Sequence, residues 1–105
     1  MWAQLIKMRT KPGRGGDLAE LHAQLEALEQ PGSGLLRTIL MQDQKDADVG
    51  YVLVVFESEE KARARENDPR RAEGMTGVRA TMGDLLDGPP EFVDLTVLGE
   101  VQNQA

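Results

Sequence analysis

The sequence predicts an α+β domain whose elements follow the order βαββαβ. Four short runs have the composition of strands, and two longer stretches repeat apolar residues at helical spacing. Clusters of proline and glycine separate these segments, where turns are expected. The 105 residues have room for one such domain, which we expect to cover residues 1–99 and to be followed by a polar tail at 100–105.

The first part of the chain predicts a strand followed by a helix. The run 2–9 mixes apolar and polar residues and ends at Lys11-Pro12-Gly13, which is typical of a turn. Asp17 precedes Glu20 by three residues, the spacing of a capping box, so a helix is expected to begin there. Its apolar stripe continues until Pro31 and consists of Leu18, Leu21, Leu25 and Leu28.

The middle of the chain predicts an antiparallel hairpin. Residues 35–42 (LLRTILMQ) and 51–56 (YVLVVF) are rich in apolar and β-branched side chains, and the polar segment 43–50 joins them. We therefore expect these two strands to lie side by side.

The last part predicts a helical region in two pieces and a final strand. Ser58 is a helix N-cap, and Asp68 with Pro69 supplies a second cap and a first helical residue, so the region is expected to break near Asn67. The dense mixture of charges over 57–71 predicts a solvated helical face. An apolar stripe follows, and then a strand: Met75, Val78, Met82, Leu85 and Leu86, and residues 91–98.

Right-handed crossovers turn this order into a ferredoxin-like antiparallel sheet backed by two helical regions. The first and third strands are expected in the centre, with the fourth beside the first. Pairing of the first and last strands is then expected to set Lys7 near Asp94 as a cross-strand ion pair.

Both faces of this sheet are expected to be apolar. In the run 51–56, neither of the two alternating sets of side chains is polar, although the helices cover one face only. A monomer rarely exposes an apolar patch larger than roughly several hundred Å². The sequence therefore predicts a homodimer that packs sheet on sheet.

Composition excludes several classes of site. Twelve basic and eighteen acidic residues give a net charge of −6, which disfavours nucleic acid as a partner. The absence of cysteine excludes disulfides, thiolate metal sites and a cysteine nucleophile. With one histidine, and with Asp43, Asp46 and Asp48 lacking calcium-loop spacing, no metal site is expected. The longest apolar run, 52–56, is too short for a membrane span, so we expect a cytoplasmic protein without membrane association.

Four stretches carry a resemblance to a known family. They are WAQLIKMRTKPG at 2–13, EQPGSGLLRTILMQD at 29–43, YVLVVFESEEKARAR at 51–65 and GPPEFVDLTV at 88–97. With this element order, the chain resembles the antibiotic biosynthesis monooxygenase family of dimeric α/β barrels. The resemblance implies a homodimer, a pocket between sheet and helices, and cofactor-independent oxygenation of quinols or polycyclic phenols, or oxidative degradation of haem.

The haem-degrading branch of that family is disfavoured for this chain. That branch carries an asparagine on the first strand and a tryptophan and a histidine on the second helical region. Ile6, Arg65 and Gly74 stand at about these positions, so none of the three roles is filled. Fold alone does not establish an activity, and catalysis stays open at this point.

His22 is the candidate catalytic base. Cofactor-free oxygenation needs a base that deprotonates the substrate, and histidine is the side chain that changes charge most readily near neutral pH. His22 lies at the edge of the leucine stripe, from which it would look into a cleft. The alternative is a boundary residue that pairs with Glu26 one turn later.

Five further residues are candidates for a pocket that binds a small aromatic ligand: Trp2, Gln4, Ile6, Met75 and Arg79. Trp2 would stack on a planar ring, Gln4 would orient a carbonyl, and Arg79 would hold an anion. The alternatives are a core or interface anchor for Trp2, an exposed amide for Gln4 and a solvent-reaching side chain for Arg79. Helical Gly74, Gly77 and Gly83 predict close packing or open space beside the second helical region.

Two rival functions belong to other classes. RNA-recognition modules share the element order, but Leu53 occupies their inner aromatic position and the chain is acidic. The stronger rival is a homodimer of the same fold that binds a small ligand, or regulates a neighbouring enzyme, without catalysis.

Overall fold

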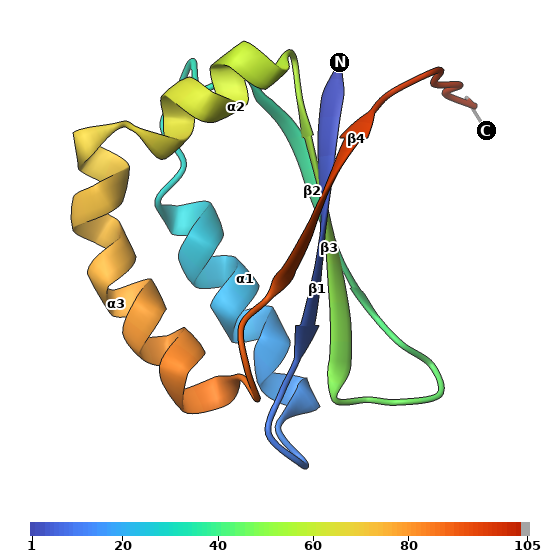
Figure 1. Cartoon of the computed structure of the whole chain (residues 1–105), viewed down its shortest axis with the longest axis vertical. Helices are drawn as coiled ribbons and strands as arrows, with labels where there is room; N and C mark the ends of the chain where they lie inside the picture. The colour runs from blue at the N-terminus through green and yellow to red at the C-terminus, as the bar shows by residue number, and fades with distance from the viewer. Residues whose placement is uncertain (104–105) are drawn as a thin grey trace.

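The computed structural model describes residues 1–103, and it confirms the predicted α+β class (Figure 1). The last two residues of the predicted tail at 100–105 lie outside the described residues. The elements are β1 (Trp2–Arg9), a 3₁₀ turn (Gly15–Asp17), α1 (Leu18–Ala27), β2 (Leu35–Gln42), β3 (Val49–Phe56), α2 (Glu59–Glu66), α3 (Pro69–Leu85) and β4 (Glu91–Thr96).

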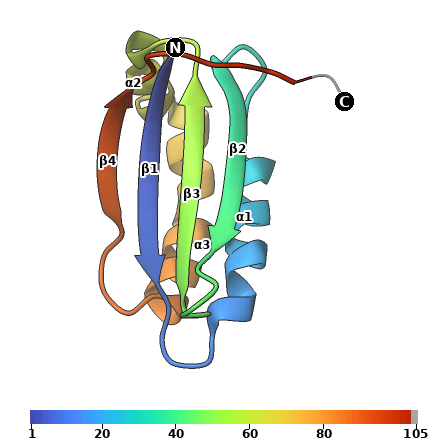
Figure 2. The same cartoon turned by 90° about the vertical axis from the view of Figure 1, so that its right-hand side faces the viewer.

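Within residues 1–103 the strands form one antiparallel sheet in the order β2-β3-β1-β4, which confirms the ferredoxin-like topology. All three helices lie on the same side of this sheet, and the opposite face faces the viewer in Figure 2. Figure 1 shows α3 farther from the sheet than α1.

The break in the second helical region has the predicted cause. Ser58 caps α2 by accepting a hydrogen bond from the backbone N–H of Lys61 (3.2 Å). Asp68 caps α3 by accepting one from the N–H of Arg70 (2.9 Å), and Pro69 is the first residue of that helix. Two caps within one run of sequence therefore give two helices instead of one long helix.

The start and the end of α1 differ from the prediction. Residues 15–17 form the 3₁₀ turn, and Asp17 adopts a helical conformation in which its carboxylate accepts from Arg14 Nε (2.7 Å) instead of closing a capping box. The helix ends at Ala27, earlier than the stripe predicts, and the chain then turns through Pro31 and Gly32, which has a positive φ of 79°.

The predicted pair between Lys7 and Asp94 is wrong. The register sets Glu91 opposite Lys7 and Gln4 opposite Asp94. Bringing Asp94 opposite Lys7 would slip β4 by three residues, an odd number, and would therefore move every side chain of β4 to the other face of the sheet. The alternation of the strand decides the register, and a single ion pair is too weak to change it.

The main core lies between the sheet and the helices. It contains side chains from β1 and β3 on one side and from all three helices on the other: Trp2, Met8, Leu18, Leu21, Val52, Val54, Phe56, Ala62, Val78, Leu85 and Leu86. These residues include most of the stripes that the sequence predicts for α1 and α3.

The opposite face of the sheet, called the open face below, is also apolar. Leu53 on β3 lies between Leu5 and Ile39, and the exposed apolar residues around them keep 38–48% of their surface accessible: Ile39, Met41, Val93 and Leu95. After β4 the chain crosses the end of this face toward β2, where Glu100 pairs with Arg37 (3.3 Å) (Figure 2). In residues 1–103, no helix is long and apolar enough to cross a membrane.

Candidate functional site

The main cavity of the protein lies between the helix-covered face of the sheet and the helices. Its volume is about 600 Å³, which is in the range of small-molecule sites. Most of its wall is apolar and comes from β1, β3, α1 and α3: Trp2, Ile6, Met8, Leu21, Leu25, Val52, Val54, Phe56, Met75 and Met82. Pro90 and Phe92 close it on the side of β4.

Apart from Gln4 and Arg37, the polar groups of the main cavity gather in two places. The first is where α1 faces β2, with His22, Glu26 and Thr38. The second is where the end of α1 meets α2 and α3, with Glu29, Arg65, Glu66 and Arg71. An apolar cavity with a few convergent polar groups is the usual form of a ligand site.

His22 lies at the edge of the leucine stripe and lines the main cavity. Its side chain is 16% exposed, and Nε2 lies 3.0 Å from the Oγ1 hydroxyl oxygen of Thr38. Nδ1 lies 3.9 Å from Oε1 of Glu26, which is too long for a hydrogen bond. When the Thr38 hydroxyl accepts from Nε2–H, the lone pair on Nδ1 is available to take a proton. The role of His22 as a base stays a prediction.

Trp2 forms the aromatic end of the cavity together with Phe56. The two ring centroids are 6.0 Å apart at 46°. The guanidinium of Arg63 lies 5.1 Å from the Trp2 ring, and that of Arg65 lies 5.2 Å from the Phe56 ring, both within cation–π range. Trp2 is 8% exposed, so it is a core residue that also lines the cavity.

Gln4, Ile6 and Met75 also line the main cavity. Gln4 donates to Oδ1 of Asp94 (2.9 Å), and Arg63 donates to Oδ2 of the same carboxylate (2.9 Å). Hydrogen bonds from Gln4 and then from Arg63 lower the pKa of Asp94. The amide group of Gln4 is therefore held in place by a fixed anion.

Arg79 is exposed and lies outside the lining of the cavity, which corrects its predicted place. It follows the buried Val78 on α3, and successive helical residues point about 100° apart, so its side chain turns away from the core. The roles of Trp2, Gln4, Ile6 and Met75 in binding a ligand stay predictions.

The helical glycines have two different surroundings. A side chain at Gly74 would overlap Leu28, so this glycine permits close packing of α3 on the end of α1. Side-chain carbons at Gly77 and Gly83 would point into open space on the exposed side of α3. The open space beside these two glycines is at the surface of α3 and is not an internal cavity.

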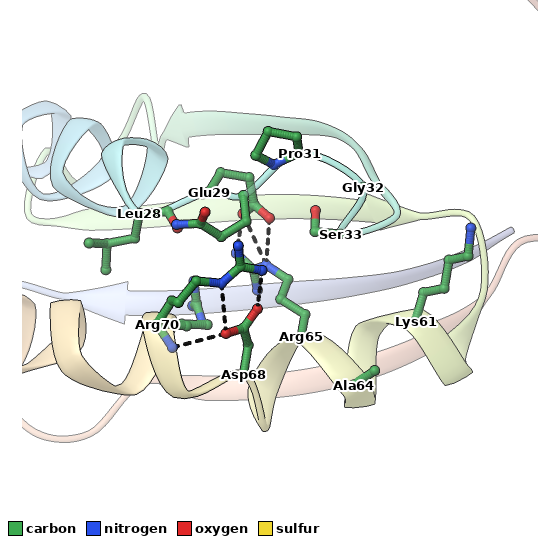
Figure 3. A pocket seen from close by; sticks show the side chains of 12 residues that line it. Leu28, Glu29, Pro31, Gly32, Ser33, Lys61, Ala64, Arg65, Asp68 and Arg70 are labelled. Atoms are coloured by element: carbon green, nitrogen blue, oxygen red, sulfur yellow. Dashed lines mark hydrogen bonds and ion pairs between the residues drawn. The ribbon is translucent and has the colours of Figure 1, made fainter.

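The second polar group was missed because 57–71 has the composition of a solvated face. Arg65 reaches from α2 to Glu29 and donates to both carboxylate oxygens: Nη2 to Oε1 at 2.7 Å and Nε to Oε2 at 3.0 Å (Figure 3). The two side chains are 16% and 20% exposed. One residue in the sequence could have indicated this burial. Ala62 is a small residue one turn before Arg65, and it marks the inward face of α2.

Arg71 on α3 completes this group. Among residues 1–103, its Nη1 nitrogen is the one buried side-chain nitrogen or oxygen atom without a hydrogen-bond partner. Leaving a buried donor unpaired costs about 1–3 kcal/mol, and more for a charged group. Burial, and then the like charge of Arg65, lower the pKa of Arg71.

Glu29 responds to the same two arginines. Burial raises the pKa of Glu29, but hydrogen bonds from Arg65 and Ser33 and the charges of Arg65 and Arg71 outweigh it, so the pKa lies below the ordinary value. A side pocket of about 170 Å³ lies next to this group, between the 28–33 turn and the start of α3 (Figure 3). Glu29, Arg65 and Arg71 line both the side pocket and the main cavity.

Over the described part of the chain, no cluster of three or more histidine, cysteine or acidic side chains is arranged to hold a metal ion. The polar side chains that line the main cavity are an imidazole, a hydroxyl, an amide, carboxylates and guanidinium groups.

Solved structures share this fold over nearly the whole chain. A candidate antibiotic biosynthesis monooxygenase from Chloroflexus aurantiacus is 25% identical, with 97% of this chain and 98% of that chain covered and a TM-score of 0.69. SnoaB from Streptomyces nogalater, described as a cofactor-independent oxygenase, is 17% identical, with 97% and 98% covered and a TM-score of 0.70. MhuD, solved with manganese protoporphyrin IX, is 19% identical, with 98% and 100% covered and a TM-score of 0.79.

The last two likenesses show the fold alone, and no curated protein matches the chain. A family model described as antibiotic biosynthesis monooxygenase matches residues 1–76, which include β1, the hairpin of β2 and β3, α2 and the start of α3. The chain therefore belongs to the antibiotic biosynthesis monooxygenase family.

Proposed function

We propose that the protein is a cofactor-independent monooxygenase that acts on an aromatic, phenolic or quinol-type small molecule in the main cavity. The observation that carries the proposal is a mostly apolar cavity of about 600 Å³ with His22 in its wall. The structural neighbour SnoaB, described as a cofactor-independent oxygenase, supports the same reaction class.

The chemistry needs a substrate that supplies all the electrons. For an anthrone, a base removes a proton from the CH₂ carbon, and the resulting electron-rich anion transfers an electron to dioxygen. A carbon–oxygen bond then forms, one oxygen atom stays as the new carbonyl, and the other leaves as water with the two substrate hydrogens. The protein has to supply a base and a pocket poor in water.

His22 is the proposed base, and Thr38 is proposed to hold its ring in position through the 3.0 Å contact. Trp2, Gln4, Ile6 and Met75 are proposed to contact the substrate, since all four line the same cavity as His22. A haem substrate is disfavoured, because Gly74 stands at about the position where the resemblance places the histidine of the haem-degrading branch, and glycine has no side chain that could bind iron.

Proteins of this family are typically homodimers. We infer that two copies of the domain, residues 1–99, pack their open faces together into a dimeric α/β barrel. The exposed apolar side chains of β2 and β4 beside Leu53 support this inference, since an unpartnered patch of that kind is unfavourable in water. The cytoplasmic location stays a prediction from the sequence.

The test is oxygen consumption by the purified protein with a panel of hydroquinones and anthrones. We expect saturable uptake by the wild type, and a loss of at least about a hundredfold in kcat for His22→Gln with binding retained. Binding is followed separately by quenching of Trp2, which is the sole tryptophan and lines the cavity. Glu20→Gln, an exposed change on α1, is the matched control.

Each outcome separates the alternatives. Uptake that survives in His22→Gln contradicts the role of His22 as base. Quenching of Trp2 without oxygen uptake by any member of the panel contradicts the enzyme and favours the non-catalytic ligand-binding or regulatory homodimer.

A further inference from the structure

The Nη1 nitrogen of Arg71 has no hydrogen-bond partner within the protein. This atom is buried, and its residue is part of the wall of both the main cavity and the side pocket. A buried guanidinium nitrogen without an acceptor is unfavourable unless something else meets it, because the donor has lost water and gained no partner.

The neighbouring charges leave this nitrogen without an anion. Glu29 receives Arg65 on both of its oxygens, at 2.7 and 3.0 Å. Glu66 is near enough to affect Arg71, but it accepts from Arg63 Nη1 at 3.4 Å. Arg65 and Arg71 thus bring two positive charges to one end of the cavity. Glu29 and Glu66 bring two negative charges there, but their hydrogen bonds go to Arg65 and Arg63 and none goes to Nη1 of Arg71.

We propose that this end of the main cavity binds the carboxylate of an acidic aromatic ligand, with Nη1 of Arg71 as the donor. A carboxylate is favoured over a neutral acceptor, because its hydrogen bond to a guanidinium is roughly twice as strong as one between neutral groups. The apolar walls then hold the ring system.

The anchor is separate from the proposed base. His22 lies on α1 with Thr38 on β2, whereas Arg71 lies near the start of α3. The inference rests on the cavity of the proposed function and names the class of ligand it accepts. Loss of the anchor should therefore weaken binding, whereas loss of His22 should slow the reaction.

The experiment compares two matched probes by isothermal titration calorimetry at neutral pH: an anthraquinone carboxylate and the corresponding neutral carboxamide. We expect the wild-type protein to prefer the carboxylate by about tenfold or more. Arg71→Gln should remove this preference while carboxamide binding stays unchanged, and Arg71→Lys should keep part of it. Arg9→Gln, which removes an exposed arginine of β1 outside the cavity, should keep all of it.

Folding is checked by urea unfolding of each variant without ligand. Because Nη1 makes no hydrogen bond within the protein, Arg71→Gln should keep the wild-type midpoint; if it unfolds, Arg71→Lys decides the question with the same two probes. Equal binding of both probes to the wild type, or an undiminished preference in folded Arg71→Gln, overturns the anchor. If Arg71→Gln does not fold, an undiminished preference in Arg71→Lys overturns it and a reduced one supports it. Oxygen uptake is recorded in a separate experiment. A carboxylate preference without oxygen uptake supports the anchor and contradicts the monooxygenase. Oxygen uptake without a carboxylate preference supports the monooxygenase and contradicts the anchor.

Discussion

Strand β3 presents Val52, Val54 and Phe56 to the helices and Leu53 and Val55 to the open face, so both sides of one strand are apolar. The two sides are covered differently. On the helix side, three helices enclose the apolar surface but leave about 600 Å³ unfilled. On the other side, the exposed apolar residues of β2 and β4 meet no helix within residues 1–103.

The two faces therefore need different partners. A hollow with polar groups in its wall fits a small ligand, whereas a broad, shallow apolar surface fits another broad apolar surface. The hollow arises because α3 packs against α1 through Gly74 and Leu28 and stands farther from the sheet (Figure 1). Ligand and second copy are therefore expected on opposite faces, and variants of each face should affect one without the other.

The largest effect is expected from a charge on the open face. Leu53→Lys places an ammonium group in the centre of the proposed sheet-to-sheet interface, between Leu5 and Ile39. An unpaired buried charge costs several kcal/mol, so we expect dimer affinity to fall by at least about a thousandfold. Sedimentation velocity at micromolar concentration should record a monomer with unchanged far-UV circular dichroism.

The matched control for Leu53→Lys is Thr76→Lys, the same new charge on the exposed side of α3. This variant should sediment like the wild type. A dimer that persists in Leu53→Lys would place the interface somewhere other than the open face. It would contradict the inference that the open face binds a second copy.

The next largest effect is a loss of stability, which we expect to differ between a leucine beside the main cavity and a leucine away from it. Leu21 and Leu85 are each 1% exposed, but Leu21 lines the main cavity and Leu85 lies outside its lining. Leu85→Ala should lower the free energy of unfolding by about 3–5 kcal/mol, and Leu21→Ala by about 2 kcal/mol, because one side of Leu21 already lacks partner atoms. Urea unfolding at fixed protomer concentration measures both, and equal losses would mean that the cavity is closed up in solution.

The topology was predictable because many weak signals agree. The alternating run of β3, the leucines of α1 and the two caps at Ser58 and Asp68 each specify a local structure, and together they leave few arrangements of the chain. His22 was predictable for the same reason, since its spacing from the leucines fixes which side of α1 it occupies.

The arginine end of the cavity was not predictable from local patterns. Arg65 and Arg71 lie in a run of mixed charge, and their burial depends on where the turn after α1 brings Glu29. The same limit explains two further predictions. Arg79 was expected to hold an anion in the cavity, but the rotation of α3 turns its side chain outward. Lys7 was expected to pair with Asp94, but the strand register sets Glu91 opposite Lys7. Long side chains reach partners that only the tertiary structure determines.

The smallest effect concerns the polar end of the hollow side and its dependence on pH. The pKa of Glu29 is lowered in the folded protein, so this carboxylate stabilises the fold fully above its ordinary pKa, and the contribution is lost as pH falls through the folded-state pKa. We expect Glu29→Gln to be less stable than the wild type at neutral pH by about 1 kcal/mol, because Arg65 loses its charged acceptor. The difference should shrink as pH falls below about 4.

Asp46, Asp68 and Asp94 also have lowered pKa values, but they are present in both proteins and cancel in the difference between the two unfolding curves. The exposed change Glu20→Gln should give a small difference that is the same at every pH. A gap between the wild type and Glu29→Gln that stays constant down to acid pH would mean that Arg65 does not hold Glu29 in solution. Arg65 would then be a second unpaired cation beside Arg71. This end of the main cavity would in that case attract an anion more strongly than the pair of Glu29 with Arg65 indicates.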